Sequence, residues 1–117
     1  MKTIRPDEID TTSTPLLDVR MRPGRKQIRG AIHYDPKHLL EADPLALPLP
    51  RESAIAVYGD SQNVVAAVVD KLQRSGYSGA AALDGGIEAW HDAGLPLEDA
   101  TQEQPIPGEA AAGIHDL

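Results

Sequence analysis

An apolar strand, a tight polar turn and an amphipathic helix follow one another between residues 54 and 76, and this unit constrains the fold most strongly. Residues 54–58 (AIAVY) form a short apolar run before a polar turn, which predicts a buried strand. From Asn63 onward apolar residues recur at helical spacing, Ser61 is a suitable N-cap and Gly76 a suitable C′ residue. The turn therefore directs free backbone N–H groups at whatever lies above the helix N-terminus, an arrangement that suits an anion.

This unit resembles the active-site segment of rhodanese-like domains, which reads strand-Y-C-x-S-G-x-R-S-helix-G-Y. The residues in register with that pattern are Tyr58, Ser61, Gly76 and Tyr77. Two of the differences bear on the chemistry of the site. Gly59 stands where the family has its catalytic cysteine, and Val64 stands where it often has an arginine. The resemblance therefore predicts the frame of the site without its reactive group.

Two further segments resemble the same family in the expected order. Residues 16–20 (LLDVR) resemble its second strand, and residues 83–97 (LDGGIEAWHDAGLPL) give the strongest match. The resemblance implies a three-layer α/β/α fold with a five-stranded parallel sheet in the order 3-2-4-5-1. We expect a rhodanese-like domain over residues 1–98 and an acidic Pro/Gly/Ala-rich tail over residues 99–117. Residues 21–29 are predicted to be a loop, and residues 36–42 a short helix after Asp35.

The chain contains no cysteine. Disulfides, thiolate metal sites and a persulfide carried on cysteine are therefore excluded for these 117 residues. Because rhodanese-like enzymes pass sulfur through a cysteine persulfide, we expect that sulfurtransferase activity has been lost. The same reasoning excludes the cysteine-dependent dual-specificity phosphatase mechanism. No cluster with metal-ligand spacing is present, and no cofactor is expected.

Charge is distributed unevenly along the chain. The formal net charge is −7, and residues 98–117 hold five acids and no lysine or arginine. Residues 20–29 hold five basic residues and no acid. The overall sign disfavours nucleic acid as a partner. The sequence has neither an apolar run of membrane-spanning length nor the pattern of a signal peptide, so we expect a cytoplasmic protein.

The candidate ligand site combines the central turn with the basic loop. If the predicted strand order holds, both leave the carboxyl ends of neighbouring strands, where open α/β sheets bind ligands. The candidates are Gly59, Asp60, Ser61, Gln62, Asn63, Val64, Arg20 and Arg22. A glycine at position 59 leaves extra room for a small anion. The alternatives are that the turn is only a surface turn, that Asp60 fills the N–H groups itself, and that the basic loop is solvated.

These observations favour a binding or regulatory domain for a small anion or a protein partner. An enzyme acting on a small anion without a covalent intermediate, and a self-association module, are the alternatives. Ser61 is a poor candidate nucleophile because none of the four histidines can be assigned to it as an oriented base. Asp18 and Arg20 are expected to fix the loop after the second strand. The sequence predicts neither the ligand, the partner nor the oligomeric state.

Overall fold

The computed structural model describes residues 2–10, 12–21 and 24–100. Five strands form one parallel sheet: β1 (Thr3–Ile4), β2 (Leu16–Asp18), β4 (Ile32–His33), β5 (Ile55–Tyr58) and β6 (Ala80–Leu83). Their order is β1-β6-β5-β2-β4. Counting only these five strands along the chain, the order is 3-2-4-5-1 read from the other edge, which confirms the prediction. The central strand β5 pairs with β2 and β6 on its two edges, and its side chains are buried in the apolar clusters on the two faces of the sheet.

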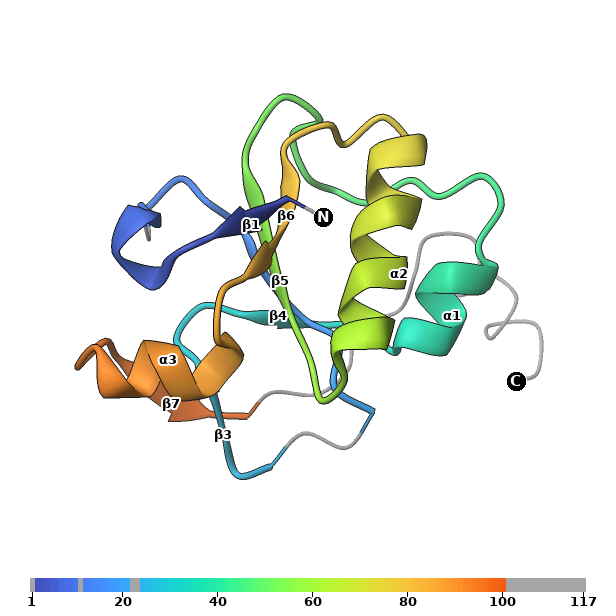
Figure 1. The fold of residues 1–117 in the computed structure, drawn as a ribbon. Helices are drawn as coiled ribbons and strands as arrows, with labels where there is room; N and C mark the ends of the chain where they lie inside the picture. Colours follow the sequence, from blue (N-terminus) through green and yellow to red (C-terminus); the bar gives the residue numbers. More distant parts are fainter. Residues whose placement is uncertain (1, 11, 22–23, 101–117) are drawn as a thin grey trace.

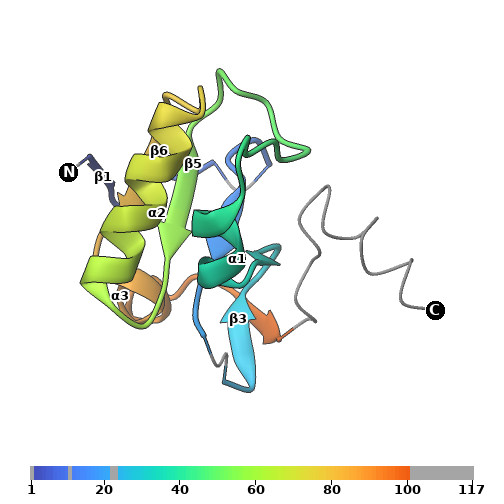
Figure 2. The ribbon, with the colours of Figure 1, turned by 90° about the vertical axis from the view of Figure 1, so that its right-hand side faces the viewer.

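Helices cover both faces of this sheet (Figure 1). The helices α1 (Pro36–Glu41) and α2 (Gln62–Arg74) pack side by side on one face, and α3 (Gly86–Asp92) lies on the other (Figures 1 and 2). A short 3-10 helix, η1 (Pro6–Glu8), follows β1. The two faces bury separate apolar clusters, one containing Leu17 and Val57 and the other containing Trp90. Strand residues alternate between these clusters, as the two-residue period of a sheet requires.

Both predicted helix starts are found with their caps. The Asp35 side chain accepts a hydrogen bond from the Lys37 N–H at 2.8 Å and begins α1. The Ser61 hydroxyl accepts from the Val64 N–H at 3.5 Å and begins α2. The cap at Ser61 fixes the start of α2, which follows the end of β5 after three residues, and so it limits the central turn to the residues between them.

The prediction that residues 21–29 form a loop was wrong. Strand β3 (Lys26–Ile28) lies within them and pairs antiparallel with β7 (Leu97–Asp99), so that the two strands form a separate ribbon. Gln27 lies opposite Glu98, and its amide donates to the Glu98 carboxylate at 2.8 Å. Strand β7 ends one residue past the predicted domain boundary at residue 98. Residues 101–117 of the predicted tail lie outside the described residues.

The part of the chain that the structure describes contains no helix with the length and apolar character needed to cross a membrane.

Candidate functional site

A hollow of about 160 Å³ lies at the carboxyl end of the sheet, above the central turn. The turn forms one wall, and the glycine pair at the start of α3 forms the other. The lining residues are Val57, Tyr58, Gly59, Asp60, Ser61, Gln62, Val65, Ala82, Leu83, Gly85 and Gly86. Sequence reasoning missed the contribution of β6 and α3 to this wall. The signal was available in the paired glycines, which permit close approach of the backbone.

The central turn contains backbone donors, and four of the five residues that carry them line the hollow. Within the described residues, none of the backbone N–H groups of residues 59–63 donates to a protein acceptor. All five groups lie just before or within the first turn of α2, a helix of 13 residues. Successive N–H groups at such a position carry partial positive charge. The turn can therefore offer hydrogen bonds to an acceptor atom that enters the hollow.

The predicted site residues are only partly brought together. Gly59, Asp60, Ser61 and Gln62 line the hollow, whereas Asn63 and Val64 do not. The Val64 side chain packs against the apolar cluster beneath α2. Arg22 lies outside the described residues. Among the lining residues Asp60 alone carries a formal charge, so the hollow itself contains no cation.

Gly59 occupies a tight position rather than an open one. A Cβ atom built there would lie 3.1 Å from Cγ2 of Val19 and 3.2 Å from Cγ2 of Val65. Two valine methyl groups therefore crowd the place where a side chain would begin. The extra room expected at position 59 is not found beside its Cα atom, although the hollow remains beyond it.

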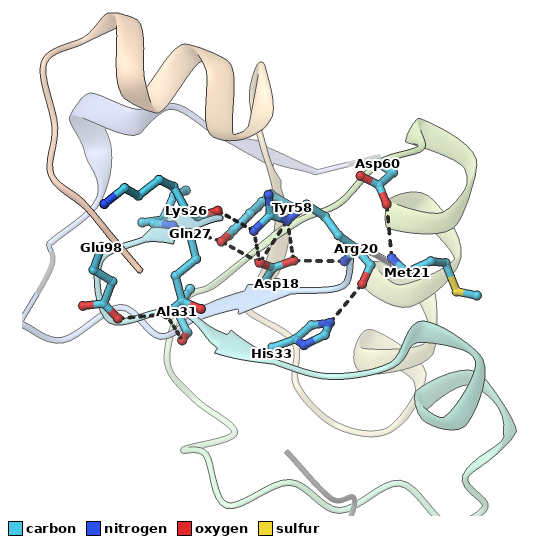
Figure 3. Close-up of polar contacts among 11 residues, drawn as sticks. Asp18, Arg20, Met21, Lys26, Gln27, Ala31, His33, Tyr58, Asp60 and Glu98 are labelled. Atoms are coloured by element: carbon cyan, nitrogen blue, oxygen red, sulfur yellow. Dashed lines mark hydrogen bonds and ion pairs between the residues drawn. The ribbon is translucent and has the colours of Figure 1, made fainter. Parts of the chain in front are cut away.

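Arg20 is held in a buried cluster with Asp18 and Tyr58 (Figure 3). Its guanidinium donates to Asp18 Oδ2 through Nη2 at 2.7 Å and to the Lys26 carbonyl at 2.9 Å. The Asp18 side chain is fully buried, and that of Arg20 is 9% exposed. This confirms that Asp18 and Arg20 fix the loop after β2. It also means that the Arg20 guanidinium is already engaged and does not line the hollow.

Tyr58 joins the same cluster to the ribbon. Its hydroxyl donates to Asp18 Oδ2 at 3.0 Å and accepts from the Ile28 N–H at 3.1 Å. Burial, followed by the Asp18 carboxylate, raises the pKa of Tyr58 well above its ordinary value, so the phenol stays protonated. Burial alone would lower the pKa of Arg20, but its hydrogen bond to Asp18 and the charge of that carboxylate raise it.

Asp60 does not fill the N–H groups of its own turn. Its Oδ2 accepts instead from the Met21 N–H at 3.1 Å, so the carboxylate joins the central turn to the loop after β2 (Figure 3). The alternative in which Asp60 caps the turn is therefore not the arrangement in this structure. Among the described residues, no group of three or more histidine or carboxylate side chains could hold a metal ion.

The chain is thus a three-layer α/β/α domain. It has a five-stranded parallel sheet and a turn with free backbone N–H groups at the end of the central strand. The family model of the rhodanese-like domain matches residues 6–93. The chain therefore belongs to the rhodanese-like domain family. The comparison with curated proteins gave no match.

Solved structures support the same assignment. The rhodanese-like domain of the Anabaena Alr3790 protein is 28% identical, with a TM-score of 0.66 over 79% of this chain and 98% of that one. A rhodanese-related protein from Thermoplasma volcanium is 25% identical, with a TM-score of 0.67 over 84% and 98%. A thiosulfate sulfurtransferase from Pseudomonas aeruginosa is 27% identical, with a TM-score of 0.68, over 83% of this chain but only 20% of that enzyme.

Proposed function

We propose that this chain is a rhodanese-like binding domain without sulfurtransferase activity, and that its ligand or protein partner engages the hollow above the central turn. The observation that carries the proposal is Gly59 at the position of the family's nucleophilic cysteine, beside five backbone N–H groups that have no acceptor among the described residues. Sulfur transfer through a persulfide needs a thiolate, and these 117 residues contain none. A binding role needs only the donors.

The electrostatics favour an acceptor of low charge. The donors are backbone dipoles, and the one charged side chain in the lining is the carboxylate of Asp60. A dianion would meet that carboxylate at close range without a cation to balance it. A carboxylate or carbonyl oxygen on a partner protein suits the hollow better than a free dianion. This favours a domain that binds a protein partner over an enzyme that acts on a small anion.

The purified chain is expected to give only the uncatalysed rate when thiosulfate and cyanide are supplied. Gly59→Cys is expected to rise above that rate, because it returns a thiol to the N–H groups at the cost of small shifts of Val19 and Val65. Gly59→Ala is the matched control, since it adds the same Cβ atom without sulfur. Turnover of thiosulfate by the unaltered chain would contradict the proposal.

Binding at the central turn is expected to be visible in amide chemical shifts. Acetate added at constant ionic strength should produce saturable shifts at residues 59–63, where the free N–H groups lie. Asp60→Asn should tighten this binding by about fivefold, because it removes the negative charge from the hollow. Shifts that do not saturate, or that are no larger there than at distant amides, would show that the turn binds nothing.

A further inference from the structure

The peptide group between Arg20 and Met21 is held from both sides (Figure 3). Its carbonyl oxygen lies 2.9 Å from Nε2 of His33, and its N–H lies 3.1 Å from Oδ2 of Asp60. Because a carbonyl oxygen can only accept, Nε2 of His33 carries the proton and donates. One peptide group therefore connects a buried histidine to the carboxylate at the rim of the hollow.

His33 is well placed to fix this peptide. It is 6% exposed, it is the last residue of β4, and it lies opposite Asp18 in the sheet register. The N–H of Arg20 is fixed as well, since it donates to Oδ1 of Asp18 at 3.0 Å. A hydrogen bond to the carbonyl also polarises the peptide and strengthens its N–H as a donor. The Met21 N–H is thus both positioned and activated to hold Asp60.

Asp60 has a second possible partner close by. An aspartate just before a helix commonly bonds the backbone N–H two residues on, which here belongs to Gln62. That N–H is one of the five donors without an acceptor among the described residues. Met21 and Gln62 therefore compete for the same carboxylate, and in this structure Met21 holds it.

We propose that the Arg20–Met21 peptide is a latch that keeps the central turn open by holding Asp60 away from it, and that His33 is the positioning residue of the latch. When the latch is lost, the Asp60 carboxylate moves onto the N–H of Gln62 and occupies the donors. The link to ligand binding rests on the proposed function, but the latch can be measured without any ligand.

Hydrogen exchange of the Met21 amide tests the latch directly. In His33→Leu we expect it to exchange about tenfold faster, the factor for losing a hydrogen bond to a charged group. The rate is taken relative to Leu72, a fully buried residue within α2, so that a general loss of stability moves both amides together. The Gln62 amide should shift at the same time.

Two control variants distinguish the loss of the His33 hydrogen bond from other effects of a substitution. His33→Gln keeps an N–H donor at a similar reach and should restore slow exchange at Met21. His91→Ala removes an exposed histidine on α3 and should leave Met21 and Gln62 unchanged. An unchanged Met21-to-Leu72 ratio in His33→Leu overturns the latch, as does a Gln variant that behaves like the leucine variant.

The consequence for binding is tested with Asp60→Ala. The acetate response at residues 59–63 should weaken in His33→Leu and return in the His33→Leu/Asp60→Ala double variant, which has no carboxylate to occupy the donors. An equal weakening with and without Asp60 would contradict the latch. If acetate binds to no variant while the Met21 ratio changes as expected, the proposed function fails and the latch stands.

Discussion

Replacing Arg20 with methionine is expected to lower the free energy of unfolding by about 3–5 kcal/mol, because it leaves the Asp18 carboxylate buried and without its cation. The Asp18 side chain is fully buried, and three of its hydrogen-bond donors belong to Arg20: the backbone N–H, Nε and Nη2. The substitution removes Nε and Nη2, whereas the backbone N–H of residue 20 and the Tyr58 hydroxyl would remain as partners. Neither of these neutral donors balances the charge. Chemical denaturation followed by circular dichroism measures the loss.

Arg74→Met is the matched control for this experiment. Arg74 also pairs with an aspartate at 2.8 Å, but both side chains are more than 60% exposed. The loss there should stay below about 1 kcal/mol, because water screens the pair and competes for it. In the buried pair, Asp18→Asn added to Arg20→Met should recover part of the loss by removing the unbalanced charge. A cost at Arg20 no larger than the cost at Arg74 would contradict this account of the cluster.

Much of the sheet could be predicted from the sequence because its signals are local. The run before Gly59 is apolar, Ser61 and Asp35 are caps, and paired glycines precede the segment that carries Trp90. Each signal lies within one element, so a single sequence contains it in full. The resemblance to a family then supplied the order of the strands, which local patterns do not determine.

The ribbon could not be predicted in the same way. Strands β3 and β7 are three residues each and lie far apart in the sequence. Neither is long enough to show a period, and the pairing of Gln27 with Glu98 exists only after the domain has folded. Sequence composition pointed to a basic loop and an acidic tail. In the structure β3 lies within the basic segment, and β7 ends at the first residue of the predicted tail.

The partners of the charged residues near the site could not be predicted from the sequence for a related reason. Arg20 was a candidate cation beside the turn, but Asp18, two residues earlier at the end of β2, already pairs with it. One alternative had Asp60 bonding within its own turn, but the donor that holds it belongs to Met21, 39 residues away. A sequence indicates which groups are charged, but the fold decides which of them are already paired.

Trp90→Ala is expected to lower the free energy of unfolding by about 3–5 kcal/mol, the range for removing a buried aromatic ring. Trp90 is fully buried and is the largest side chain in the apolar cluster beneath α3. The chain has one tryptophan and no phenylalanine, so no other ring of this size is available to refill the cavity. Thermal unfolding followed by circular dichroism measures the effect, because the alanine variant has no tryptophan fluorescence.

Trp90→Phe separates the two contributions of the side chain. The indole Nε1–H donates to the Pro96 carbonyl at 2.9 Å and so ties α3 to the segment that leads into β7. Phenylalanine keeps most of the buried surface and loses this hydrogen bond, so its cost should be smaller, about 1–2 kcal/mol. Equal losses in the two variants would mean that the hydrogen bond, rather than burial, holds α3 in place.

The same two variants test whether the packing of Trp90 in the core affects binding at the hollow. Gly85 and Gly86 form one wall of the hollow and begin α3, which Trp90 anchors against the sheet. A helix that has lost its anchor cannot hold that wall at a fixed distance from the central turn. Acetate-induced shifts at residues 59–63 should therefore weaken in folded Trp90→Ala and stay close to normal in Trp90→Phe. An unweakened response in the alanine variant would mean that the central turn binds without the α3 wall.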